Sequence, residues 1–229
     1  MSKNPNKKKT RSRSPEKKAA QFERIIDAGK ELFSDKGREG FSLRGLAKIL
    51  DMNQNNLYNY VDSKRELWIA IRNKFFKQQR DENREIIKNH KGSTIDLLLK
   101  ITSNFLDFAT KDFGAFSMMH IIPSPPSKKV GPFEKEYRAF NFLDGTTRIV
   151  QKAIEDGEIK ENNATALSFH LYSTILGAAI VERTMRILEQ NNNYNGDAVS
   201  EIIQFKQTNF PSLEFRNHIL RKVESFLKE

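Results

Sequence analysis

Cysteine is absent from the sequence. Without thiols the chain can form neither a disulfide nor a thiolate metal site, so a metal would need His, Asp and Glu side chains alone. The motifs of several large enzyme classes are missing too: there is no P-loop, no G-x-G-x-x-G, no G-x-S-x-G and no H-E-x-x-H. We therefore expect a protein with no metal, no cofactor and no enzymatic activity.

Long apolar runs are also scarce. The longest, residues 171–181, is shorter than the roughly 20 residues that a membrane-spanning helix needs, and it is expected to be a buried helix. The first 20 residues are rich in lysine, arginine, serine and asparagine, and they contain no apolar stretch of the kind found in a secretory signal. These features favour a cytoplasmic protein that does not bind membranes.

Positive charge is concentrated at the N-terminus. The formal net charge is +10, and residues 1–18 carry eight Lys or Arg side chains against Glu16 alone. A segment with so little apolar surface does not fold by itself, so we expect residues 1–18 to be a disordered basic tail. Two interpretations remain open: the tail contacts a polyanion and releases its counterions, or it is a solvated end that aids solubility.

Helical periodicity begins close to this tail. Apolar residues recur at helical spacing over residues 16–36, and Gly37 interrupts the pattern. Ser42 can cap a second, shorter helix, in which Leu46 and Ala47 are expected core residues. Because Ala47 is small, it would let neighbouring helices cross closely.

The third helix, predicted over residues 53–60, is notably polar. Asn53 can cap it, Leu57 is its one aliphatic anchor, and amides and tyrosines make up most of the rest. Amides can bond base edges and tyrosine hydroxyls can reach phosphates, although a solvated helix held by Leu57 and Val61 would show the same pattern. A short helix, a tight turn and this polar helix together have the dimensions of a helix-turn-helix unit.

The remainder of the chain also has a helical pattern. A long fourth helix is expected to begin at Asp62 or Ser63. Four prolines exclude a continuous helix over residues 121–132. Further helical runs are predicted over residues 94–108, 133–155, 164–188 and 215–226. Since no two strand-like runs joined by a turn are found, the sequence predicts an all-α fold.

Residues 41–67, FSLRGLAKILDMNQNNLYNYVDSKREL, resemble the DNA-binding signature of the TetR family. In that signature a short helix, a turn and a recognition helix containing Leu-Tyr precede a Ser-Lys start of the next helix, and LFSDKG at residues 32–37 also fits. The resemblance covers about residues 20–70. It implies an N-terminal three-helix helix-turn-helix DNA-binding domain over residues 19–66 and a larger helical ligand-binding and dimerisation domain over residues 67–229.

The resemblance also implies a set of DNA contacts. It places the amides of the third helix at the bases, its tyrosines at bases or backbone, and an arginine of the second helix on DNA. Helix starts are expected to serve phosphates, because backbone N–H groups point outwards there. The expected DNA-binding residues are Ser42, Arg44, Gln54, Asn55, Asn56, Tyr58, Tyr60 and Lys64. Asp51 stands where the family often has glycine, and aspartate tolerates a left-handed turn.

Large, adaptable apolar side chains are frequent in the second half of the chain. They suit a pocket for an apolar or amphipathic molecule, which the resemblance implies, although each of them taken alone is more often a core residue. A histidine beside two methionines could hydrogen-bond an effector. The candidate pocket residues are Phe105, Phe108, Phe116, Met119, His120, Phe140 and Tyr172.

Dimerisation has a physical motive, because a single helix-turn-helix unit makes few contacts with DNA. Regulators similar to this family read paired half-sites in successive major grooves. Two late apolar stripes could form a four-helix interface across a two-fold axis, or they could belong to the core of one chain. The candidate interface residues are Leu171, Ile175, Ala178, Phe215, Ile219, Val223 and Phe226.

The sequence therefore predicts a ligand-responsive transcriptional regulator, by family default a repressor. It would bind a pseudo-palindromic operator in double-stranded DNA as a homodimer and be released by a small apolar or amphipathic effector. The effector would change the angle of the long fourth helix and so the spacing of the two recognition helices. The alternative is an architectural DNA-binding protein that senses no ligand and binds mainly through its basic tail.

Overall fold

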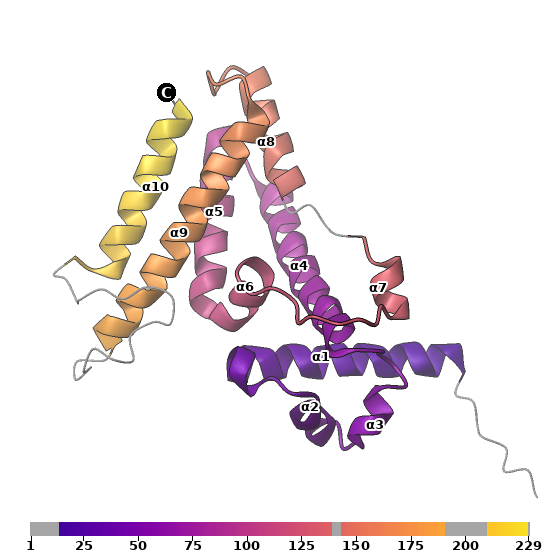
Figure 1. Ribbon diagram of the computed structural model, residues 1–229. Coiled ribbons are helices and arrows are strands. Elements are labelled where there is room, and N and C mark those ends of the chain that lie inside the picture. The colour runs from indigo at the N-terminus through magenta and orange to yellow at the C-terminus, as the bar shows by residue number, and fades with distance from the viewer. Residues whose placement is uncertain (1–13, 139–142, 191–209, 229) are drawn as a thin grey trace, which may run out of the picture. The chain divides into compact units, whose positions relative to one another are not determined.

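The computed structural model describes residues 14–138, 143–190 and 210–228, and the regular structure in these ranges is entirely helical (Figure 1). The all-α prediction is therefore confirmed. The helices are α1 (Pro15–Gly40), α2 (Leu43–Ile49), α3 (Gln54–Leu57), α4 (Lys64–Asn89), α5 (Thr94–Lys111), α6 (Phe113–His120), α7 (Pro132–Glu136), α8 (Leu143–Glu155), α9 (Ala164–Gln190) and α10 (Ser212–Lys228).

Contacts divide the chain into two compact units. Unit 1 comprises residues 1–71 and 124–137, and unit 2 comprises residues 72–123 and 138–229. Helix α4 is shared, since its first turns belong to unit 1 and the rest to unit 2. The chain also returns to unit 1 through residues 124–137, between α6 and α8 of unit 2.

Helix α1 begins earlier than the predicted end of the basic tail. Proline at the first helical position needs no N–H partner, and Ser14 Oγ accepts a hydrogen bond from the Lys17 backbone N–H at 3.4 Å. Lys17 is thus helical, whereas residues 1–13 of the predicted tail lie outside the described residues. Gly37 interrupts α1 with φ 61° and ψ −163°, a backbone conformation that favours glycine. The predicted break at Gly37 is confirmed.

The core of unit 1 forms around the residues that the apolar spacing predicts. Leu46, Ala47, Leu57 and Val61 are buried, and none of them is more than 3% exposed. Trp68, at the start of α4, is also buried, with Phe33 packed edge-on against it at 5.0 Å and Phe41 at 5.9 Å between ring centroids. Together these contacts hold α1, α2 and α3 against the first turns of α4.

A buried carboxyl group joins three segments within unit 1. Glu66 has no exposed surface, and its Oε2 accepts the Asp62 backbone N–H at 2.6 Å. Its Oε1 accepts the backbone N–H of Phe133 at 2.7 Å and that of Glu134 at 3.4 Å. These are the first N–H groups of α7, which have no partner within a helix. Glu66 therefore fixes the turn before α4 and anchors α7.

Two further contacts attach α7, and a glycine makes room for the Glu66 carboxyl group. Phe22 of α1 packs against Phe133 at 5.7 Å between ring centroids, and Arg65 Nε lies 2.7 Å from Glu134 Oε1. A Cβ on Gly131 would lie only 1.9 Å from Glu66 Oε2. Only glycine at this position leaves the carboxyl group in place.

Helices α5, α8, α9 and α10 supply the core of unit 2. They bury residues that include Leu98, Val150, Leu171 and Val223. Helix α9 has the length and apolar composition of a membrane span. Its contribution to this core, which includes Leu171, identifies it as the buried helix that the sequence predicts.

An ion-pair network fastens α10 to α9 and α5. Glu182 of α9 is 1% exposed and accepts hydrogen bonds from Arg186 Nε and Arg216 Nε, each at 2.9 Å. Arg216 of α10 also pairs with Asp107 and donates to Thr110 Oγ1 of α5 at 3.0 Å. Two guanidinium groups therefore compensate the buried Glu182 carboxyl group, as a buried charge requires.

One predicted helix is corrected by the structure. The pattern over residues 133–155 predicts a single helix, whereas α7 ends at Glu136 and α8 begins at Leu143. Tyr137, with φ −62° and ψ 127°, has an extended backbone that ends α7, so the chain does not continue from α7 into α8 as one helix. The predicted loop over residues 121–132 is confirmed up to Pro132, where α7 begins.

Replacing Glu66 with glutamine tests the role of the carboxyl group. Glutamine has the same volume as glutamate, but an NH₂ group replaces one of the two acceptor oxygens. That NH₂ group would then face a backbone N–H, and two donors cannot bond to each other. We expect the free energy of unfolding to fall by about 1–3 kcal/mol, measured by denaturation followed through the fluorescence of Trp68, the one tryptophan in the chain.

Glu85→Gln, an exposed glutamate on the same helix, is the matched control and should change stability by no more than about 0.5 kcal/mol. Equal stability of the Glu66→Gln and Glu85→Gln variants would contradict the anchoring role of Glu66.

Candidate DNA-binding surface and ligand cavity

The turn between α2 and α3 has the local geometry that the sequence predicts. Ser42 Oγ accepts the Gly45 backbone N–H at 3.0 Å and caps α2, while Asn53 Oδ1 accepts the Asn55 backbone N–H at 2.9 Å and caps α3. Asp51 takes the left-handed conformation with φ 50°. Both predicted caps and the left-handed turn residue are confirmed.

The third helix is shorter than predicted. It spans Gln54–Leu57, whereas the sequence pattern predicts a helix over residues 53–60. The Tyr60 and Val61 backbone N–H groups both bond to Leu57 O, at 2.9 and 3.1 Å, so the chain turns tightly there instead of continuing as a helix. Tyr58 therefore belongs to the turn that follows α3 and not to the helix itself.

The predicted DNA-binding residues lie on one part of unit 1. Leu57 is fully buried, while Gln54, Asn55 and Asn56 around it are exposed. Ser42, Arg44, Tyr58 and Lys64 are exposed too, and Tyr60 is half-buried. A helix with one buried anchor and exposed amides has little role in its own core, and its side chains can reach a partner.

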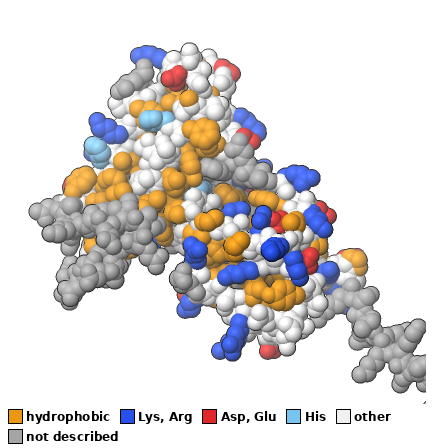
Figure 2. All heavy atoms as spheres, viewed as in Figure 1, with side chains coloured by type: hydrophobic (Ala, Val, Ile, Leu, Met, Phe, Trp, Pro, Cys, Tyr) orange, Lys and Arg blue, Asp and Glu red, His pale blue; other side chains and the backbone are white. Residues whose placement is uncertain are grey.

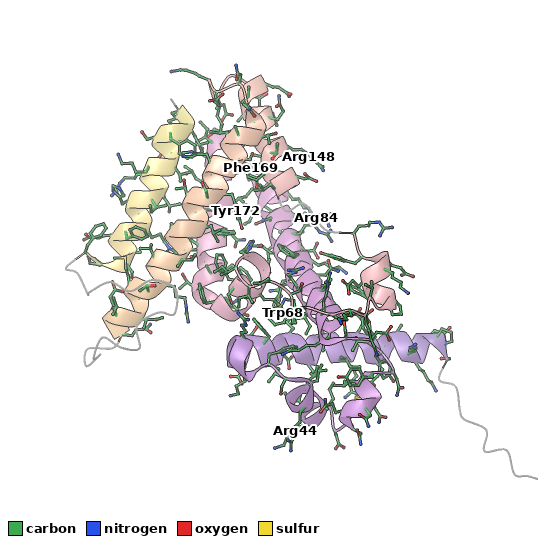
Figure 3. All side chains as sticks on the ribbon, in the orientation of Figure 1. Arg44, Trp68, Arg84, Arg148, Phe169 and Tyr172 are labelled. Atoms are coloured by element: carbon green, nitrogen blue, oxygen red, sulfur yellow. The ribbon has the colours of Figure 1, made fainter. Side chains whose placement is uncertain are left out.

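A shallow concavity of about 510 Å³ joins part of this set on α2 and α3. Its lining includes Ser42, Arg44 and Gln54, together with Lys48, an exposed residue of α2 that the sequence analysis does not single out. Figure 3 labels Arg44 in unit 1, and Figure 2 shows more Lys and Arg than Asp and Glu on the visible face of that unit. The surface carries the charge that a polyanion needs.

Lys64 is held close to the start of α2. Its ammonium Nζ lies 3.3 Å from Phe41 O and 5.6 Å from the centroid of the Phe41 ring. Because Phe41 directly precedes Ser42, these contacts bring the Lys64 ammonium next to the Ser42 cap.

A cavity of about 370 Å³ lies within unit 2, among α4, α5, α8 and α9. Its volume falls in the usual range of small-molecule sites, about 300–1,000 Å³. Apolar side chains that include Leu98, Phe105 and Ile175 form much of the wall. The polar lining residues are Gln79, Arg80, Asn83, Arg84, Thr102, Asp144, Thr146, Arg148, Ser168 and Tyr172.

His120 lies behind this wall. Its Nδ1 is 3.2 Å from the Tyr172 hydroxyl, and the rings of Phe76, Phe105 and Phe116 lie within 5.0–5.8 Å of its own, between centroids. Burial among these rings lowers the pKa of His120 to about 4. At neutral pH the imidazole is uncharged and can orient Tyr172, which lines the cavity.

Residues 25–71 match the family model described as bacterial regulatory proteins, tetR family. This span covers α2, α3 and the turn between them. Over this segment the chain is similar to the tetR family of bacterial regulatory proteins. A search of curated proteins finds no match to the chain.

Solved structures share the fold of the chain over nearly its whole length. AibR, in complex with isovaleryl coenzyme A and operator DNA, is 14% identical, with a TM-score of 0.56, and the match covers 89% of this chain and 97% of that one. FadR from Bacillus subtilis, in complex with stearoyl-CoA, is 15% identical, with a TM-score of 0.56 and coverages of 90% and 98%. A TetR/AcrR-family transcriptional regulator from Thermobifida fusca is 18% identical, with a TM-score of 0.54 and coverages of 90% and 97%.

The candidate pocket residues lie in different places. Phe105 and Tyr172 line the cavity, and His120 contacts both of them from behind. Phe108, Phe116 and Met119 do not line the cavity. Phe116 and Met119 are buried, and Phe108 packs against the core of unit 2. Phe140 lies outside the described residues.

The candidate interface residues lie mostly in the core of unit 2. Leu171, Ile175, Ala178 and Val223 are at most 7% exposed within the single chain, and Leu171 and Ile175 also line the cavity. Phe215, Ile219 and Phe226 are partly buried against the same core. The exposed positions of α9 are neighbours of the predicted stripe and include Phe169, whose side chain is 60% exposed.

Sequence reasoning missed the arginines of the cavity. Arg80 and Arg84 of α4 are four residues apart, a spacing that places both on one face of a helix. That spacing was an available signal, but many exposed helices carry it. Arg148 reaches the same cavity from α8, and nothing in the sequence indicates that α4 and α8 share a cavity.

The depressed pKa of His120 predicts a pH-dependent stability. The unfolded chain protonates this histidine near pH 6.5 and the folded chain near pH 4, so acid favours unfolding between these values. We expect the free energy of unfolding to fall by up to about 3 kcal/mol as the pH is lowered through this window. Denaturation followed by circular dichroism at several pH values measures it.

His120→Asn, which keeps a polar group near Tyr172 without a titrating imidazole, is the comparison. It should show a smaller loss of stability over the same pH window. An identical slope in both proteins would show that His120 is not the responsible group.

Proposed function

We propose that the chain is a transcriptional regulator that binds a pseudo-palindromic operator as a homodimer and represses transcription until a small amphipathic effector occupies the cavity of unit 2. The observation that carries the proposal is the exposed row of amides on α3 around the fully buried Leu57. The complex of AibR with isovaleryl coenzyme A and operator DNA supports it, because a protein of similar fold there binds both DNA and a small molecule.

On this proposal the exposed residues of unit 1 divide into two roles. Gln54, Asn55 and Asn56 contact base edges, where amides can bond adenine with two hydrogen bonds. The positioning contacts to phosphates come from the helix starts, the turn after α3 and the basic residues of α2. They are Ser42, Arg44, Lys48, Tyr58, Tyr60 and Lys64.

Selection from a random duplex DNA library at roughly physiological salt tests this assignment. We expect a pseudo-palindrome to be enriched. Gln54→Ala should weaken operator binding by about 1–3 kcal/mol and relax preference at one base position in each half-site. Lys48→Ala should weaken binding about equally on all sequences and reduce its salt dependence.

Asn217→Ala, an exposed amide on α10, is the control and should leave binding unchanged. Deleting residues 1–13 keeps the Ser14 cap of α1 and tests the architectural alternative. Loss of all binding in that deletion, together with no enriched sequence, would replace the regulator with a protein that binds DNA through its tail.

The exposed face of α9 supports the homodimer. Ala166, Phe169, His170, Ser173 and Gly177 are exposed and recur at helical spacing. A Cβ added to Gly177 would meet nothing within 4 Å, so a second helix has room to approach there. The exposed apolar Phe169 is the natural centre of such an interface.

Replacing Phe169 with glutamate should place two like charges at the two-fold axis and give a monomer. The mass in solution, measured by light scattering after gel filtration, should halve, and operator binding should weaken with it. Val130→Glu changes an apolar residue of unit 1 that is 48% exposed, and it should leave the mass unchanged. A Phe169→Glu protein that remains dimeric would remove α9 from the proposed interface.

The proposed release uses the continuity of α4 between the units. Phe76, Arg80 and Arg84 of this helix line the cavity, and Glu66 in its first turn anchors α7 within unit 1. An effector can shift the operator equilibrium only if it binds the two states with different affinity. An effector that contacts α4 would have different affinities for the operator-bound and the released state if α4 has a different position in each.

A further inference from the structure

We propose that the cavity of unit 2 is specific for an amphipathic anion, with an apolar chain inside and a carboxylate or phosphate group held by Arg84 and Arg148. The inference rests on the proposed effector function and specifies the chemistry of that same site. It is carried by the arrangement of charged and apolar residues in the wall of the cavity.

Side chains from four helices form the apolar wall, with Phe76 and Ile87 contributed by α4. Leu98, Ile101 and Phe105 come from α5, Ile149 from α8, and Leu171 and Ile175 from α9. Leu98 is fully buried, and Phe105, Leu171 and Ile175 are at most 8% exposed. Such a surface can bind an alkyl or acyl chain, and it offers few hydrogen bonds to a polar chain.

The charged residues of the lining are predominantly positive. Three arginines, Arg80, Arg84 and Arg148, line the cavity together with Asp144 as the one acid. Arg84 and Arg148 are exposed and lie on different helices, α4 and α8 (Figure 3). Guanidinium groups bind carboxylate and phosphate oxygens through two parallel N–H donors, and two of them brought together favour an anion over a neutral group.

Little has to be broken for Arg84 to bind a ligand. It donates to Asp81 at 3.2 Å, and both side chains of this pair are more than half exposed. Exposed pairs of this kind contribute little to stability. Replacing the Arg84–Asp81 ion pair with an ion pair between Arg84 and a ligand carboxylate therefore costs little free energy.

The first turn of α8 supplies a further favourable element. Leu143, Asp144, Gly145 and Thr146 all line the cavity, so the positive end of the α8 dipole lies beside it. A Cβ added to Gly145 would meet nothing within 4 Å. Because Gly145 lines the cavity, we expect a larger side chain there to extend into the ligand space.

Titration calorimetry of the full chain with three eight-carbon probes tests the inference. Sodium octanoate should bind about tenfold more tightly than 1-octanol, and octylammonium should bind more weakly than either. Arg84→Gln and Arg148→Gln should each weaken octanoate binding by roughly three- to tenfold and leave octanol binding unchanged. Arg221→Gln, an exposed arginine of α10 outside the lining, is the control.

Gly145→Leu should abolish the binding of both octanoate and octanol, because its side chain would fill the cavity, and its melting temperature should be no lower than that of the unaltered protein. A further titration with octanoyl coenzyme A separates the two sources of negative charge. Tighter binding than octanoate assigns the charge to the phosphates of the coenzyme, and weaker binding assigns it to a free carboxylate; either result supports an anion.

The inference is overturned if octanol binds as tightly as octanoate, if no probe binds, or if Gly145→Leu binds normally. Operator release is measured separately, by displacing operator DNA with each probe. Octanoate that binds through Arg84 and Arg148 but does not displace operator would leave the anion site standing and contradict the proposed effector function.

Discussion

The buried carboxyl group of Glu66 is the constraint on which the arrangement of unit 1 depends. One oxygen fixes the Asp62 turn between the polar helix α3 and the long helix α4, and the other holds the first N–H groups of α7. Buried backbone donors without partners lower the stability of the fold, so the Glu66 carboxyl group is needed at this place. Gly131 is needed with it, because a Cβ there would overlap the carboxyl group. Glu66 thus fixes the turn that joins α3, with its exposed amides, to α4.

A second buried carboxyl group has the equivalent role in unit 2. Glu182 ties α9 to α10 and α5 through Arg216, and this network leaves the cavity bounded by helices that are held in place. Helix α4 contributes Glu66 to one unit and the arginines of the cavity to the other. A ligand bound by those arginines, as proposed, would contact the helix that follows the turn after α3.

Much of the local structure of unit 1 could be predicted from the sequence. Ser42, Asn53 and Asp51 act through bonds to neighbours in sequence, so their roles follow from residue type and spacing. Leu46 and Leu57 follow from apolar periodicity. The length of α3 was overestimated, because Tyr58 and Tyr60 are compatible with a helix until the tight turn at Leu57 is known. Glu66 and the arginines of the cavity depend on contacts between distant segments, and no local pattern contains them.

The central claim is that the exposed face of α3 reads DNA, and a structure of the protein bound to its selected operator tests it most directly. We expect a two-fold symmetric complex with α3 of each protomer in successive major grooves, Gln54 to Asn56 at base edges, and Lys64 beside a phosphate. A complex in which α3 faces solvent and DNA is contacted only by the N-terminal segment would contradict it.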